Sequence, residues 1–356
     1  MSAAELERRY RRLLAVHPWE HRRTYEEEMI AVLLADARPG QIRPGFRDTV
    51  DLVGAGLRAR LRVGARGFTE PAWADAAAVT GLLVALILLA AAAKGLADQL
   101  VPNPDLGPPS MRPVGPDSVD WLRVAGWAAV TVAALTGLRR TAAGLAWSGV
   151  VAWLVLVGPG VIDQPTYVVD TLPQLALALL AAAALAVPAT PRRALAVLGP
   201  SRAAVLILAP LAAVAVLEAS RLSGAGVDAV GPVPVYAFYG VLQARSETLL
   251  WLYVAGLTTA ALAVLVAVAS LAAPVRRRIA VLLAPVAALA LVIDTALAGW
   301  SVSTVHMGHA IPLVPAQWLM LVLVPPVTFL AGVLLVRRRE ETLRMVALGR
   351  AADRER

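Results

Sequence analysis

The sequence predicts an all-α polytopic membrane protein with about eight transmembrane helices and a small N-terminal cytoplasmic helical domain. The first observation behind this prediction is composition. Of 356 residues, 58% are hydrophobic and only 16% are charged, against about 25% charged in a typical soluble chain. The second is that the apolar residues form long blocks, and the third is that arginine clusters separate those blocks.

The first apolar block, residues 76–93, reads AAAVTGLLVALILLAAAA and contains no charge and no proline. A helix rises about 1.5 Å per residue, so this block alone nearly crosses a hydrocarbon core of about 30 Å. Charges and prolines divide the rest of the chain into similar blocks. We therefore predict a membrane domain at 71–338, with spans at about 76–98, 119–138, 141–162, 172–190, 203–221, 247–272, 279–300 and 315–336.

One outward loop holds the segment VPVYAFYGVLQA at 233–244, which is too short and too proline-marked to be a span. Its aromatic residues Tyr236, Phe238 and Tyr239 are typical of the membrane boundary. We expect an interfacial helix or a re-entrant segment here.

Arginine clusters predict the topology. They follow every second span, at 139–140, 192–193 with Arg202, 276–278 and 337–339. Basic residues are retained on the cytoplasmic side of bacterial membranes, and no secretory signal is evident at the start of the chain. We expect a multi-pass protein of the bacterial cell (inner) membrane with both termini cytoplasmic, including a charged tail at 339–356. This rule also explains the net charge of +8 without nucleic acid as a partner.

Residues 1–70 contain three amphipathic patterns, which predict a cytoplasmic head of three short helices. The apolar positions of the first are Leu6, Tyr10, Leu13 and Leu14; of the second Tyr25, Met29, Val32 and Leu33; of the third Phe46, Val50, Val53 and Leu57. Pro18 ends the first pattern, and prolines and glycines at 39–45 separate the second from the third.

The head also carries a sequence motif: Tyr-Arg-x-Leu-Leu, a proline, then a basic residue followed by Tyr-x-x-Glu-Met. Its residues here are Tyr10, Arg11, Leu13, Leu14, Pro18, Arg22 or Arg23, Tyr25, Glu28 and Met29. This stretch resembles the helical prefix domain found before many bacterial permease-type membrane regions, and is similar to related signalling domains encoded beside PadR-type repressors. The resemblance implies an interaction or regulatory module with no catalytic residue. The candidate interaction surface is Tyr10, Arg11, Arg22, Arg23, Tyr25 and Glu28.

Acidic residues mark the outer ends of the four outward-running spans. They are Asp98, Asp163, Glu218 and Asp294, and ionisable groups in a membrane are costly enough to require a reason. They are candidate ion or substrate contacts of an acidic vestibule. Alternatively, Lys94 with Asp98 and Glu218 with Arg221 are self-neutralising pairs within one helix, and the acid excess reflects the scarcity of arginine outside.

The chain lacks the commonest signatures of catalysis. Cysteine is absent, and there is no GxxxxGK[ST], HExxH or GxSxG motif. His306 and His309 are three residues apart, but no third metal ligand lies near them in the sequence. We therefore predict no cofactor and no metal site.

These observations predict a non-enzymatic integral membrane protein whose head is an interaction or regulatory module. Its partners are then the lipid bilayer and a cytoplasmic protein that binds residues 1–70. The alternative is a transporter or permease component that uses the outer acids for ion or substrate contact. An intramembrane enzyme acting on lipid or peptidoglycan precursors is a third hypothesis, which lacks a convergent set of reactive groups.

Overall fold

The computed structural model describes residues 2–16, 19–37, 41, 44–56, 71–100, 118–161, 165–188, 190, 192–224, 235–237, 242–244, 246–300, 303 and 311–354. By its internal contacts the chain divides into two compact units, Met1–Trp73 and Ala74–Arg356. Each unit is described by itself below.

The head contains helix α1 (Ser2–Leu14), helix α2 (Trp19–Ala35) and a third helix over residues 46–56. Leu6, Tyr10 and Leu14 follow one another at four-residue spacing, which places them on one face of α1. They are buried together with Ile30 of α2 and form the core of the head. The apolar face predicted for the third helix is largely open, since Phe46 is 86% exposed.

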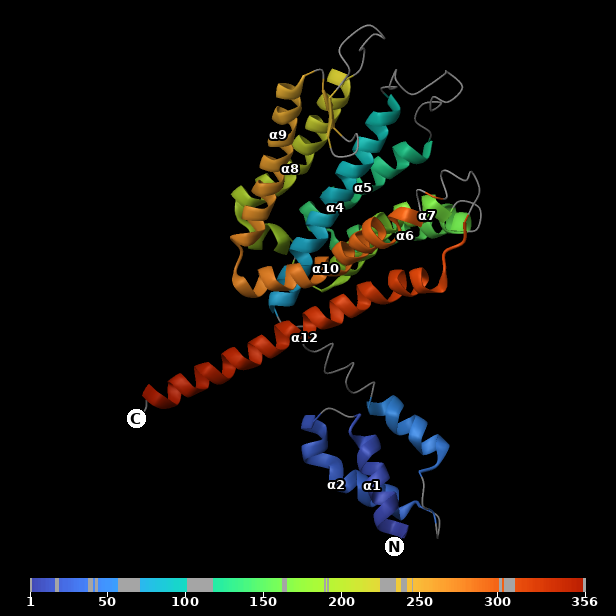
Figure 1. Cartoon of the computed structure of the whole chain (residues 1–356). Helices are drawn as coiled ribbons and strands as arrows, with labels where there is room; N and C mark the ends of the chain where they lie inside the picture. The colour runs from blue at the N-terminus through green and yellow to red at the C-terminus, as the bar shows by residue number, and fades with distance from the viewer. Residues whose placement is uncertain are drawn as a thin grey trace. The chain divides into compact units, whose positions relative to one another are not determined.

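The second unit contains the long apolar helices (Figure 1). They are α4 (Pro71–Leu100), α5 (Ser118–Thr136), α6 (Arg139–Leu156), α7 (Pro165–Ala186), α8 (Arg193–Gly224), α9 (Glu247–Ala269), α10 (Ala273–Ala296) and α12 (Pro315–Arg354). A short 3-10 helix, η2 (Gly158–Val161), follows α6. Among the described residues, seven of these helices are long and apolar enough to cross a membrane; α6, which begins with two arginines, falls short.

Helix α4 lies at the centre of this unit. Val79 and Leu82 pack in one cluster with residues of α8, α9 and α10, while Ala85 packs with α5, α6 and α7. Val84 joins a third cluster with α6 and α7. The first span in the sequence is therefore the helix around which the others pack.

The described part of the segment at 233–244 forms two strands, so the expectation of an interfacial helix is wrong, whereas a re-entrant segment stays a prediction. Strands β1 (Val235–Ala237) and β2 (Leu242–Ala244) pair antiparallel, with Val235 opposite Ala244. Leu242 and Ala244 are fully buried and pack with side chains of α8 and α9. β-branched and aromatic residues favour strands when one face can be covered, and these two helices cover it.

Two glycines near the arginine clusters end or interrupt a helix. Gly137 has φ 91° and ends α5, because Leu138 N–H donates to Ala133 O (2.8 Å) in the arrangement typical of a glycine helix end. Gly199, with φ 72°, interrupts α8 shortly after Arg193. A residue with a Cβ is rarely stable at such positive φ values.

Helix α12 continues beyond the predicted last span. It runs through Pro325 and Pro326 and includes most of the predicted tail, where Leu343 and Met345 are exposed. Arg278 of α10, almost fully buried, pairs with Glu340 of α12 at 2.7 Å.

Candidate functional site

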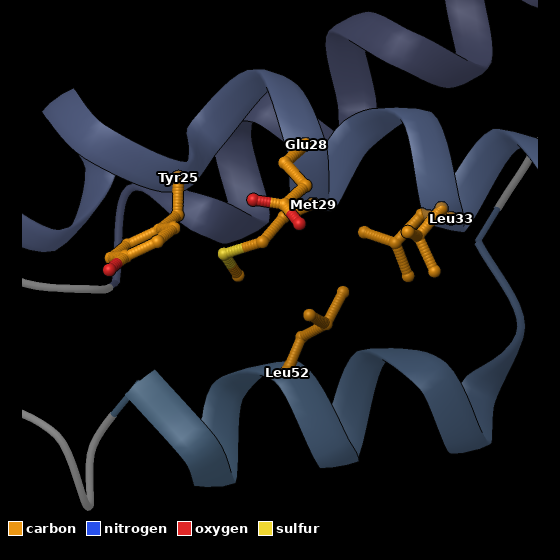
Figure 2. A pocket seen from close by; sticks show the side chains of 6 residues that line it. Tyr25, Glu28, Met29, Leu33 and Leu52 are labelled. Carbon is orange, nitrogen blue, oxygen red and sulfur yellow. The ribbon is translucent and has the colours of Figure 1, made fainter.

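An open groove lies on the head between α2 and the helix at 46–56. Its volume is about 440 Å³, and it is lined by Tyr25, Glu28, Met29, Val32, Leu33 and Leu52. Figure 2 shows Met29 and Leu33 of α2 facing Leu52 of the opposite helix across the gap. The apolar residues of the second amphipathic pattern therefore line a groove. The residue of α2 that is buried in the core of the head is Ile30.

Two of the apolar side chains that line the groove are exposed and do not contribute to the core of the head. Val32 is 64% and Tyr25 46% exposed. Solvent-exposed apolar patches on soluble domains commonly mark interaction sites. Glu28, also exposed, is the charged residue among those that line the groove.

Arg11 stabilises the two helices that support the groove. Its guanidinium donates to Glu7 within α1 (2.9 Å) and to Glu27 of α2 (2.9 Å), and lies 3.6 Å from Glu26. The hydrogen bonds to Glu27 and Glu7 raise the pKa of Arg11. Arg11 thus joins α1 to α2, although it was predicted to belong to an interaction surface.

The prediction that Tyr10 lies on an interaction surface is wrong. Its side chain is 1% exposed, so it belongs to the core of the head and not to an interaction surface. Its hydroxyl donates to Asp48 at 3.5 Å, and burial, followed by the nearby Asp48 charge, raises the pKa of the phenol. The spacing of Tyr10 with Leu6 and Leu14 already indicated a core position. Tyr25 and Glu28 line the groove, and the side chains of Arg22 and Arg23 in α2 lie outside the described residues.

A second polar site joins the C-terminal ends of α4 and α8. Lys94 Nζ lies 2.5 Å from Asp98 Oδ1 and 3.2 Å from Glu218 Oε1, and Arg221 lies 2.9 Å from Glu218 Oε2 and 3.5 Å from Asp98 Oδ1. Each cation therefore contacts both acids. The two pairs predicted within single helices form one cluster of two positive and two negative charges.

Arg221 also caps α4. Its guanidinium donates to the backbone carbonyls of Ala97 (3.0 Å) and Asp98 (3.1 Å). The last carbonyls of a helix have no partner within the helix and carry partial negative charge, so an arginine there is stabilising. The cluster therefore has no net charge and links α4 to α8. Each of its acids is paired with both cations.

Three of the four acids predicted at outer span ends are described, and these three do not form one group. Asp294 is exposed on α10, where its neighbours Ile293 and Leu297 pack in a cluster with residues of α7 and α12. Asp98 and Glu218 instead join α4 to α8. Asp163 lies outside the described residues. The sequence missed the link between the helices, although both pairs occur at predicted outer ends of parallel spans.

Within the described ranges no group of three or more His, Asp or Glu side chains could hold a metal ion. His306 and His309 lie outside those ranges. Comparison with known protein families, with curated proteins and with solved structures finds no match to this chain.

Proposed function

We propose that this chain is a non-enzymatic integral membrane protein whose N-terminal head is a cytoplasmic interaction or regulatory module, with the groove on α2 as its binding surface. The observation that carries this proposal is the exposed apolar lining of the groove, Tyr25 and Val32 above all. The resemblance of the head to permease-prefix and PadR-associated signalling domains supports the same function.

The partner that best fits this groove is an amphipathic helix. Grooves between two helices commonly accept a third helix through apolar residues at i, i+3 and i+4. Glu28 favours a partner that carries a basic residue beside its apolar face, because an opposite charge at the rim selects the partner and its orientation.

The test compares full-length proteins purified from native membranes after cross-linking. Val32→Asp places a charge in the groove, and Val50→Asp is the control, since Val50 is similarly exposed (52%) but does not line it. We expect the wild type and Val50→Asp to retain a common protein that Val32→Asp loses. Equal retention by all three, together with an unchanged phenotype on deletion of residues 1–70, would refute the proposal.

We also propose that α6 is the eighth span and that both termini are cytoplasmic. Support comes from the direction of α8. Asp75 pairs with Arg193 at the N-terminal ends of α4 and α8, and Asp98 with Arg221 at their C-terminal ends, so these helices are parallel. An odd number of crossings must separate parallel spans. Helices α5, α6 and α7 supply three, whereas α5 and α7 alone would supply two.

The native chain contains no cysteine, which makes this topology directly testable. Single cysteines at Leu138, before α6, and at Gly158, after it, should react with a membrane-impermeant maleimide from opposite sides. Labelling of both from the same side would mean that α6 does not cross.

The transporter or permease alternative has less support. Asp98 and Glu218 are compensated by Lys94 and Arg221, and Asp294 is on a different helix pair. Transport that Asp294→Asn abolishes in reconstituted vesicles would restore this alternative.

A further inference from the structure

A small hollow lies between α4, α5, α7 and the starts of α6 and α8. Its lining contains three arginines, Arg139, Arg192 and Arg193. The remaining lining residues are apolar: Ala78, Leu82, Ala134, Leu185 and Ala194. It therefore joins two arginine clusters that are about fifty residues apart in the sequence and presents a basic edge beside an apolar wall.

The positive charge of this hollow is only partly compensated. Arg193 Nε donates to Asp75 Oδ1 at 2.5 Å. Arg139 donates through Nη2 to the carbonyl of Ala184 (3.1 Å), whereas its Nη1 is buried and has no hydrogen-bond partner among the residues that the structure describes. A buried donor without a partner is costly, and more so when charged. None of the described residues that line the hollow is acidic.

The backbone brings further positive potential to the same place. Helix α6 begins at Arg139, directly after the Gly137 turn, and its N-cap Leu138 provides no side-chain hydrogen bond. Helix α8 begins at Arg193, and Arg192 before it has φ 57°, a left-handed conformation that is unfavourable for arginine. Helix N-termini attract anions through free N–H groups and the helix dipole.

We propose that this hollow binds the phosphate of an anionic phospholipid headgroup. The arginines supply charge-assisted donors for phosphate, and the apolar wall is suited to the first part of the acyl chains, which a free phosphate ion would not use. Basic pockets between transmembrane helices are a known arrangement for headgroup binding. The interior of the hollow holds only about 10 Å³ of free volume, room for about one water. The phosphate therefore lies at the mouth, where Arg192 is exposed.

The experiment measures lipid binding to the full-length protein by native mass spectrometry and by thermal unfolding in lipid nanodiscs. Wild type is compared in phosphatidylcholine alone and with added phosphatidylglycerol. We expect phosphatidylglycerol to remain bound and to raise the melting temperature. Arg139→Gln and Arg192→Gln should each weaken its binding about fivefold, the effect of about one basic contact near a membrane surface.

Arg140→Gln is the matched control, because Arg140 is adjacent, exposed and absent from the lining. Equal loss of phosphatidylglycerol in Arg140→Gln and Arg139→Gln would overturn the proposal, as would equal binding of both lipids by the wild type. Stabilisation of detergent-solubilised protein by inorganic phosphate to the same extent would assign the hollow to a free anion and overturn the lipid assignment. If Arg139→Gln fails to fold, the exposed Arg192→Gln decides alone.

Discussion

Helices α4 and α9 have similar mean hydropathy and very different surroundings. In the most apolar part of α4, 72% of residues are buried inside the protein, whereas in α9 only 6% are. In water such a difference would require α9 to be the more polar helix. In a membrane both are apolar, because lipid chains solvate a leucine as well as a protein interior does.

Hydropathy in this chain therefore does not indicate how closely a helix is packed by its neighbours. What distinguishes α4 is close contact with neighbouring helices over most of its surface, through small residues such as Gly81 and Ala85. The following predictions test whether that contact makes α4 energetically different from α9.

The largest effect is expected from truncating one leucine in each helix, a buried one in α4 and an exposed one in α9. Leu82→Ala should lower the free energy of unfolding by about 2–5 kcal/mol, because Leu82 is 2% exposed and the cavity remains within the protein. Leu265→Ala in α9, where Leu265 is 62% exposed, should change it by less than about 0.5 kcal/mol. Denaturant titration in mixed micelles measures both, and equal losses would refute the distinction.

The next effect concerns the charged cluster at the C-terminal end of α4. Glu218→Gln leaves Lys94 and Arg221 with one carboxylate, and should cost about 1–3 kcal/mol. Asp294→Asn on exposed α10 is the control and should be near neutral. A larger loss in Asp294→Asn, measured by the same titration, would mean that the cluster does not hold α4 to α8.

Glycines within α4 should respond with opposite signs. A Cβ at Gly81 would lie 3.0 Å from the Leu185 side chain of α7, so Gly81→Ala should destabilise by about 1 kcal/mol. A Cβ at Gly95 meets no atom of the described residues within 4 Å, and Gly95→Ala should stabilise by up to about 1 kcal/mol through helix propensity. Thermal unfolding of the two variants in nanodiscs distinguishes them, and shifts of the same sign would contradict the close approach of α4 and α7.

The smallest effect is expected from a change of pH. It should weaken α1, which is stabilised by charges, and leave the apolar helix α4 unchanged. In α1, a hydrogen bond from Arg9 and then the charge of Arg8 lower the pKa of Glu5. The stabilisation from ionised Glu5 is therefore present at neutral pH and is lost as pH falls through this lowered pKa. Hydrogen exchange, corrected for intrinsic rates, should show α1 losing protection in acid.

Helix α4 provides the internal control for this measurement. It has no acidic residue between Asp75 and Asp98, so its central amides should keep their protection over the same pH range. Loss of protection in both helices at the same pH would indicate global unfolding instead of titration in α1.

In the head, the sequence predicted the helices but only part of their packing. The spacing of Leu6, Tyr10 and Leu14 indicates one buried face, and the structure buries all three. The apolar pattern of α2 was equally regular, yet Val32 remains exposed and Ile30 is buried instead. Periodicity shows that a face is apolar; whether another helix covers it depends on residues distant in the sequence.

By itself, the sequence determined the multispan helical class, the positions of the apolar blocks and the charges that mark their ends. These depend on single residues and their nearest neighbours along the chain, since transfer into a membrane and helix geometry are local properties. Only the tertiary structure decided that α4 is central, that Lys94 and Asp98 share charges with Glu218 and Arg221, and that Arg139 and Arg193 line one hollow. Such pairings join residues more than fifty positions apart, and in a bilayer they arise from close packing and polar contacts, which hydropathy does not record.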